Sequence, residues 1–266
     1  MRVLVACEFS GTVRDAFRKR GHDAWSCDLL PCESDPAWHL TGDVRRFLDS
    51  APNDKPWDLM IGHPPCTYLS VSGMHWTKRG LRDPRLTEDA LQFVRDLMAA
   101  PIPRIAIENP VSIISSRIRK PDQIIQPWQF GHDASKSTCL WLKGLPRIKH
   151  TKIVPPKGWK LVKFAADLLG GDSDCAWCDD CGAEFAECDC FGPTQDGVEY
   201  AERAGYLFGR PTNGPERMVW GNQTPSGQNK LGPSKMRWAE RSKTFQGIAD
   251  AMASQWGGEQ GALAYA

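Results

Sequence analysis

Short apolar runs recur along the first 150 or so positions, and each is bounded by polar or turn-forming residues. Runs of this length that are rich in Val, Ile and Leu are typical of strands buried in a parallel sheet. They predict strands at residues 2–9, 24–27, 59–61, 105–107 and 139–142.

Between these runs, apolar residues recur at helical spacing. Val13, Ala16 and Phe17 predict a helix that ends at Gly21, because glycine is common just past a helix C-terminus. A second helix is predicted to open at Thr87. The apolar stripe of this second helix consists of Ala90, Leu91, Val94, Leu97 and Met98.

The last helical stripe lies near the C-terminus, between Thr244 and the Gly257-Gly258 pair. Its apolar positions follow the pattern of an amphipathic helix: Phe245, Ile248, Ala249, Met252, Ala253 and Trp256. Strands that alternate with helices in this way predict an α/β protein with a mostly parallel, doubly wound sheet. We therefore expect a Rossmann-like fold.

The stretch from about residue 151 to 240 breaks this rhythm, because it is rich in Gly and Pro and holds five of the ten cysteines. We therefore expect three parts in the chain. These are a main domain over 1–150, an inserted region over 151–239, and a C-terminal helical segment over 240–266 that returns to the main domain.

The 266 residues carry a formal net charge of +1, so no strong overall field favours one kind of partner. Residues 111–163 hold 11 Lys/Arg against 2 Asp/Glu, whereas residues 172–189 hold seven acids and no base. A basic stretch that precedes an acidic one indicates either a polyanionic partner or ordinary solvated surface. We find no apolar run long enough for a bilayer and no signal-peptide pattern, so we expect a cytoplasmic protein without a membrane partner.

The strand at 59–61 leads directly into two prolines and a cysteine. Pro64 and Pro65 fix φ and offer no N–H, so the chain leaves the strand as a rigid turn. Cys66 is therefore expected at the carboxyl end of a strand, where open α/β sheets bind ligands. A thiol held there suits a nucleophile, although most free cysteines are small, inert core residues.

Further polar residues are expected at the same edge of the sheet. Glu108 ends the strand at 105–107, and the small-residue turn that contains Ser10 ends the first strand. Asp28 follows the strand at 24–27, where an acid accepts the hydroxyls of a ribose or is simply an exposed turn residue. Asp43 accepts a hydrogen bond from an adenine amino group or caps a short helix.

Five cysteines form the pattern Cys175-x2-Cys178-x2-Cys181-x6-Cys188-x-Cys190. The central CxxC is followed by glycine, as in a zinc knuckle, and the last two cysteines supply a second pair. Four thiolates in a tetrahedron suit Zn²⁺, so we predict a structural zinc site at Cys178, Cys181, Cys188 and Cys190, with Cys175 as the spare thiol. An iron–sulfur cluster and unligated thiols are the alternatives.

The segment 67–85 follows the nucleophile candidate and carries Trp76 together with four basic residues, which are Lys78, Arg79, Arg82 and Arg85. Its serines and glycine predict a mobile loop. Such a loop suits a lid over a nucleic-acid substrate, and an ordinary charged surface loop is the alternative.

Two of these segments resemble motifs of the DNA cytosine-5 methyltransferases. The stretch 7–11, Cys-Glu-Phe-Ser-Gly, is similar to the first cofactor motif DLFAGxGG, although the acid is displaced and the later glycine pair is missing. The stretch 62–70, Gly-His-Pro-Pro-Cys-Thr-Tyr-Leu-Ser, resembles the nucleophile motif GGPPCQxFS. It departs from that motif at His63, Thr67 and Leu69.

Glu108-Asn-Pro resembles the ENV motif of the same family, and Lys136-Ser-Thr falls where the family has QxRxR. Both arginines are absent there, and Lys136 is the nearest substitute. The resemblance covers about 1–150 and 240–257, and PPC and EN are its more specific parts. The small size and divergent motifs resemble phage-type members, which implies a host cytoplasm as the location.

The resemblance implies an S-adenosylmethionine-dependent methyltransferase fold in which the zinc-containing insert is the target-recognition region. It implies that Cys66 attacks C6 of cytosine, that Glu108 binds N3 and the amino group, and that Lys136 holds O2. S-adenosylmethionine would contact Phe9, Ser10, Gly11, Asp28, Asp43 and Pro64. The substrate would be double-stranded DNA with the cytosine flipped out of the helix, and the protein would act as a monomer.

Two other functions remain open on the sequence. One is a catalytically lapsed, zinc-containing DNA-binding protein on a methyltransferase fold, which the altered first motif and the missing arginines favour. The other is a related enzyme that modifies C5 of a pyrimidine with another donor, or that acts on RNA or a free nucleotide.

Overall fold

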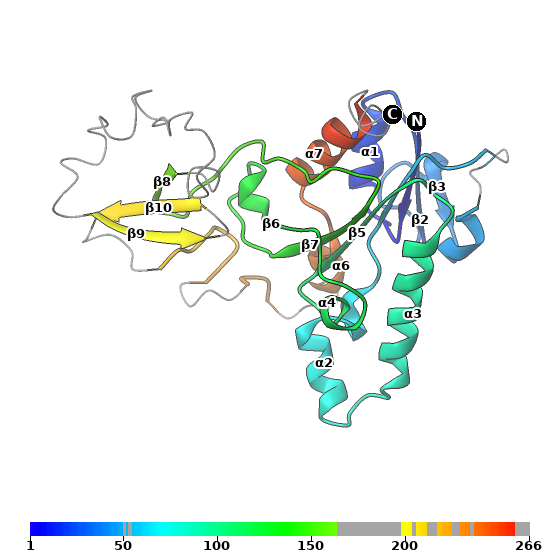
Figure 1. Cartoon of the computed structure of the whole chain (residues 1–266), viewed down its shortest axis with the longest axis horizontal. Helices are drawn as coiled ribbons and strands as arrows, with labels where there is room; N and C mark the ends of the chain where they lie inside the picture. The colour runs from blue at the N-terminus through cyan, green and yellow to red at the C-terminus, as the bar shows by residue number, and fades with distance from the viewer. Residues whose placement is uncertain are drawn as a thin grey trace.

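The computed structural model describes residues 1–49, 52, 55–163, 198–203, 206–211, 217–224, 229–232, 234 and 237–258. The main body is a seven-stranded sheet with helices on both faces (Figure 1). The strand order is β3-β2-β1-β4-β5-β7-β6. The strands are β1 (Arg2–Ala6), β2 (Asp23–Asp28), β3 (His39–Thr41), β4 (Leu59–Gly62), β5 (Arg104–Pro110), β6 (Gln123–Ile125) and β7 (Thr138–Lys143).

The sheet is parallel from β3 to β5, and β7 then pairs antiparallel with both β5 and β6. The chain builds outward from β1 to β3 and then crosses to β4 on the other side of β1. Open sheets bind ligands outside the carboxyl ends of the strands at such a switch point. The expected Rossmann-like α/β architecture is confirmed, and the turns after β1 and β4 lie at this switch point.

Helices α1 (Thr12–Arg18) and α7 (Gln246–Gly257) cover one face of the sheet, and α3 (Arg85–Ala99) covers the other (Figure 1). Side chains of β1 alternate between the two layers, since Val3 joins the core beneath α1 and α7 while Leu4 joins the core beneath α3. This alternation is expected of a strand that is buried on both faces. All three helices predicted from the apolar stripes are confirmed.

The predicted mobile loop over 67–85 is wrong for its first half. A 3₁₀ turn, η3 (Cys66–Tyr68), is followed by helix α2 (Val71–Lys78). Ser70 is the N-cap of this helix, because its Oγ accepts a hydrogen bond from the backbone N–H of Gly73 at 3.3 Å. Serine is favoured both in loops and at N-caps, so a local reading of the sequence could not separate the two.

A separate antiparallel sheet has the order β8-β10-β9 and is formed by β8 (Lys160–Lys163), β9 (Val198–Arg203) and β10 (Tyr206–Pro211) (Figure 1). Trp128, which follows β6, stacks on Trp220 with ring centroids 5.4 Å apart and contacts Phe208 of β10 edge-on. This aromatic cluster joins the small sheet to the main one.

The five cysteines from Cys175 to Cys190 lie outside the described residues, and the predicted zinc site therefore stays a prediction. Within the described ranges, no group of His, Cys, Asp and Glu side chains could hold a metal ion. No helix in that same part of the chain is long and apolar enough to cross a membrane. The described residues also form helices α4 (Ile114–Arg117) and α6 (Arg237–Ser242), together with the 3₁₀ helices η1 (Pro36–Trp38) and η4 (Pro127–Gln129).

A fully buried arginine ties the connection between β2 and β3 to α1. Arg14 donates through Nη1 to Ser26 Oγ at 3.1 Å and through Nη2 to Ser34 Oγ at 2.6 Å. It also contacts Cys32 Sγ at 3.3 Å and Asp15 Oδ1 at 2.8 Å. A buried guanidinium is stable only with such a set of partners.

We predict that Arg14→Met lowers the free energy of unfolding by about 2–4 kcal/mol, because the buried Ser26 and the partly buried bonds to Cys32 and Ser34 lose their donor. Urea denaturation measures this loss. Arg20→Met replaces an exposed arginine just after the same helix and is expected to change stability by less than about 0.5 kcal/mol. Equal losses in the two variants would contradict the assigned role of Arg14.

Candidate active site

Cys66 begins the η3 turn directly after the two prolines and is exposed. The turn that carries it is clamped from β5, since Asn109 Nδ2 donates to the carbonyl oxygen of Pro64 at 2.8 Å. Further along, the backbone N–H of Ile113 donates to the carbonyl oxygen of Leu69 at 3.0 Å. The thiol is therefore presented on a segment that is fixed at both ends.

Glu108 lies beside this turn because of the register of the sheet. Gly62 of β4 pairs with Ile107 of β5, so the next residues on each strand, His63 and Glu108, are neighbours. His63 Nδ1 lies 3.0 Å from Glu108 Oε2, and the two side chains are 8% and 11% exposed. The carboxyl group of Glu108 is thus buried and is held in place by its hydrogen bond with His63.

Burial acts to raise the pKa of Glu108, but the hydrogen bond from His63 and the positive charge of Lys136 outweigh it. The net effect holds this pKa below its ordinary value, so Glu108 is a carboxylate at neutral pH. The opposite holds for Cys66. Although the residue is exposed, protein around its sulfur desolvates the thiolate and the negative charge of Glu108 adds to this, so the pKa of the Cys66 thiol is raised.

Two cationic groups partly oppose that rise in the pKa of Cys66, and they belong to Lys136 and Arg241. Lys136 lies just before β7, and its Nζ donates to the backbone carbonyl oxygen of Arg241 at 3.0 Å. This bond brings α6 to the site. Positive charge beside a thiol favours the thiolate, so both residues limit the rise in the pKa of Cys66.

The structure thus brings together Cys66, Glu108 and Lys136, which the sequence singles out on three separate segments. Their chemical roles stay predictions. Sequence reasoning missed Arg241, which approaches from α6, and it treated His63 only as a departure from a motif.

The turn between β1 and α1 differs from the expected cofactor cradle. Glu8 is buried and fills the N-terminus of α1, since its carboxylate accepts hydrogen bonds from the backbone N–H groups of Val13 at 2.6 Å and Arg14 at 3.2 Å. The resemblance places cofactor contacts in the turn just before these N–H groups, at Phe9, Ser10 and Gly11. The acid, displaced by one position from the family motif, reaches these N–H groups and favours the positive end of the helix.

Ser10 and Gly11, in the same turn between β1 and α1, also make close contacts within the chain. Ser10 Oγ accepts a hydrogen bond from the N–H of Thr12 at 3.3 Å. Gly11 has φ +76°, and a Cβ added there would lie 2.2 Å from Ser34 Oγ. Glycine is therefore required at this position by the close approach of the β2–β3 connection as well as by its backbone conformation.

Asp28 and Asp43 lie at the carboxyl ends of β2 and β3. Asp28 accepts a hydrogen bond from the N–H of Leu30 at 2.9 Å, and burial raises its pKa. Asp43 caps the short 3₁₀ helix η2 (Val44–Phe47) and pairs with Arg45 at 2.6 Å. Of the two roles weighed for Asp43, the cap is observed, and the adenine contact stays a prediction.

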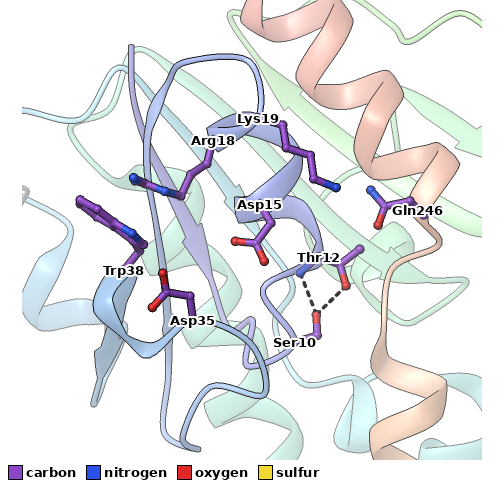
Figure 2. Close-up of a pocket in the computed structure, with 8 residues that line it drawn as sticks. All are labelled: Ser10, Thr12, Asp15, Arg18, Lys19, Asp35, Trp38 and Gln246. Atoms are coloured by element: carbon purple, nitrogen blue, oxygen red, sulfur yellow. Dashed lines mark hydrogen bonds between the residues drawn. The ribbon is translucent and has the colours of Figure 1, made fainter.

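A cleft of about 430 Å³ lies between α1, the segment before β3, and the start of α7 (Figure 2). Arg18 stacks over the ring of Trp38 at 3.4 Å on one side of it, and Lys19 and Gln246 lie on the other. Ser10 is the one predicted cofactor residue among its lining residues, and Cys66 does not line it. The cleft is therefore distinct from the thiol site.

No protein-family model matches the chain, and no curated protein matches it. Among solved structures, it is similar to a prophage-encoded E. coli protein assigned as a DNA modification methyltransferase, with 16% identity and a TM-score of 0.40 over 66% of this chain and 57% of the other. It is also similar to the Dnmt2 methyltransferase of S. pombe, with 16% identity and a TM-score of 0.36 over 54% and 49%.

The chain thus spans less than two thirds of the length of either of these structures. Likenesses this weak do not establish the family of the chain or its function.

Proposed function

We propose that this protein is an S-adenosylmethionine-dependent DNA cytosine-5 methyltransferase that works through a covalent bond between Cys66 and C6 of a flipped-out cytosine. The observation that carries the proposal is the pairing of a rigidly held thiol with a buried carboxylate. Cys66 lies in the turn after β4, and Glu108 lies near the carboxyl end of the adjacent β5, the edge where open sheets bind ligands.

The proposed chemistry needs both groups. C5 of cytosine is a poor nucleophile, and addition of a thiolate at C6 turns the ring into an enamine-like species whose C5 accepts a methyl group. Glu108 binds N3 and the amino group and stabilises the ring as Cys66 adds. Lys136, whose charge acts on both Cys66 and Glu108, would hold O2.

The cofactor would supply an electrophilic methyl group, and the residues at the crevice fit it. Asp28 and Asp43, at the ends of β2 and β3, are acceptors for ribose hydroxyl and adenine amino donors. Two buried polar atoms near the β4 and β5 ends, His63 Nε2 and Asn109 Oδ1, have no hydrogen-bond partner among the described residues. Buried atoms of this kind are expected where a ligand completes the hydrogen bonding.

Helix α2 supports DNA as the substrate, because it projects from the body of the protein immediately after the Cys66 turn (Figure 1). Val71 is 69% exposed and Trp76 is 45% exposed on this helix, and Lys78 and Arg79 follow at its end. Apolar and aromatic side chains flanked by positive charge suit insertion beside an extruded base and contact with phosphates. Arg82 and Arg85, by contrast, are engaged with Thr67 and Asp83.

A structural zinc in the inserted region remains part of the proposal, on the spacing of the cysteines alone. We expect about one zinc per chain by metal analysis of the purified protein, because four closely spaced thiolates form one tetrahedral site. Replacing both Cys178 and Cys181 by serine is expected to remove it. Zinc absent from the wild-type protein purified without chelators would contradict this part.

One observation favours an alternative donor. Glu8 accepts hydrogen bonds from two backbone N–H groups at the N-terminus of α1, so these two groups are not open to a cofactor. The alternative is a pyrimidine C5-modifying enzyme that keeps the Cys66 addition but uses another one-carbon donor. Product formation with other donors and none with S-adenosylmethionine would favour it.

Nucleoside mass spectrometry tests the proposed function. Unmethylated duplex DNA is incubated with the protein and S-adenosylmethionine and then digested to nucleosides. We expect 5-methylcytosine as a new product. Its absence with correctly folded, metal-loaded protein would contradict the proposal, and single-stranded DNA and RNA serve as competing substrates.

A further inference from the structure

We propose that His63 is a positioning residue that keeps Glu108 ready to take the proton released by the Cys66 thiol and to pass it to N3 of the cytosine. This inference rests on the proposed function. It gives a role to a residue that the sequence marks only as a departure from the glycine of the family motif.

The geometry of His63 points to Glu108. Its Nδ1 lies 3.0 Å from Glu108 Oε2, inside hydrogen-bonding distance, and both side chains are about nine-tenths buried. The sheet enforces this contact, because the pairing of Gly62 with Ile107 sets the two following residues side by side. The register of β4 against β5 therefore sets the contact between His63 and Glu108.

Packing alone does not account for this histidine. Its second ring nitrogen, Nε2, is buried and has no partner among the described residues. Buried polar atoms are normally satisfied, and a histidine held only by packing would be expected to bond through both nitrogens. The hydrogen bond that His63 does make is the one from Nδ1 to Glu108.

The charged groups around the pair come from four elements. Three groups lower the pKa of Glu108. They are His63 from the turn after β4, Lys136 from the segment before β7, and Thr138 of β7, which contributes a hydrogen bond. Glu8, after β1, lies near enough for His63 to oppose the rise of its pKa, and Arg241 of α6 acts on Cys66. Among these groups, His63 donates to the Glu108 carboxylate, with Nδ1 lying 3.0 Å from Oε2.

The proton balance explains why Glu108 must start as a carboxylate. The raised pKa of Cys66 means that the resting group is a thiol, so its proton has to leave as the S–C6 bond forms. Glu108, whose pKa is lowered, accepts that proton and gives it to N3, and the adduct is neutral. After methyl transfer, a base removes the C5 proton, the S–C6 bond breaks, and the N3 proton returns to Cys66 through Glu108.

The sign of the pH dependence follows. In the wild-type protein Glu108 is ionised throughout the neutral range, so kcat/KM is flat there and falls once the Cys66 proton is lost at higher pH. Without the bond from His63, the burial of Glu108 is opposed only by Lys136 and Thr138, so the pKa of Glu108 is expected to rise. Such a variant can no longer accept the thiol proton until the pH rises through that new pKa.

The test compares two variants at the same position. His63→Ala removes the donor and is expected to lower kcat/KM at neutral pH by about 10- to 100-fold, with activity recovering as the pH rises. His63→Asn places an amide N–H close to the position of Nδ1 and is expected to restore both the rate and the flat profile. S-adenosylmethionine binding by calorimetry and the circular dichroism spectrum check that both variants are folded.

Each outcome is decisive. A rising limb in His63→Ala that is absent in His63→Asn supports the inference. A flat, wild-type-like profile in His63→Ala overturns it while the proposed function stands. An asparagine variant that behaves like the alanine variant shows that the imidazole is needed for packing and also overturns it. A wild-type protein that makes no 5-methylcytosine ends the proposed function and the inference together.

Discussion

Cys66→Ala is expected to lower methyl transfer to DNA by at least about 1,000-fold, the scale on which enzymes lose rate when a covalent nucleophile is removed. The side chain is exposed at the start of η3, so its truncation opens no cavity in the core. Folding and DNA binding are therefore expected to stay unchanged. Urea denaturation and a gel-shift assay measure these two properties alongside single-turnover methylation.

Cys32→Ser is the matched control, because Cys32 is partly exposed and bonds to Arg14 on the β2–β3 connection, away from the thiol site. Serine keeps an acceptor for Arg14, and activity is expected to match the wild type. Turnover retained in Cys66→Ala would contradict covalent catalysis by this residue, even if the control behaves as expected.

Glu108→Gln is expected to reduce kcat by about 100- to 10,000-fold while substrate affinity changes little. Glutamine has nearly the same shape and can still donate to N3 and accept from the cytosine amino group. It cannot take up or deliver a proton, so the loss falls on the chemical step. Single-turnover rates and DNA dissociation constants separate the two effects.

Glu88→Gln is the control for this substitution, because Glu88 is an exposed residue of α3 that pairs with Arg117 at 2.8 Å. It makes the same chemical change away from the site and is expected to leave kcat unchanged. A loss of DNA affinity in Glu108→Gln with an unchanged single-turnover rate would contradict the assigned role.

Apolar periodicity was sufficient to predict the sheet and its main helices, because burial on both faces of a parallel sheet leaves long hydrophobic runs. β1, β4 and β5 each consist largely of such a run. β3 and β6 have three residues each and carry polar side chains, so no period reveals them. Their pairing depends on neighbours that are distant in sequence.

The thiol and carboxylate of the site were predictable because each comes directly after or near the end of an apolar run at the same edge of the sheet. The bond between His63 and Glu108 was not, since it depends on the register of β4 against β5. Arg241 joins the site through a bond from Lys136 to a backbone carbonyl 105 positions away, which no local pattern encodes. The hydrogen bonds of Glu8 were not predictable for a similar reason, because its partners are backbone N–H groups of the next helix.

The most direct test of the account is to trap the bond between Cys66 and C6. Duplex DNA in which cytosine is replaced by 5-fluorocytosine is incubated with the protein and S-adenosylmethionine, because fluorine at C5 blocks the proton loss that releases the thiol. We expect a covalent protein–DNA complex that survives denaturation, with peptide mass spectrometry placing the nucleotide and one added methyl group on Cys66. No adduct, or an adduct on another residue, would contradict the assignment of Cys66 as the nucleophile.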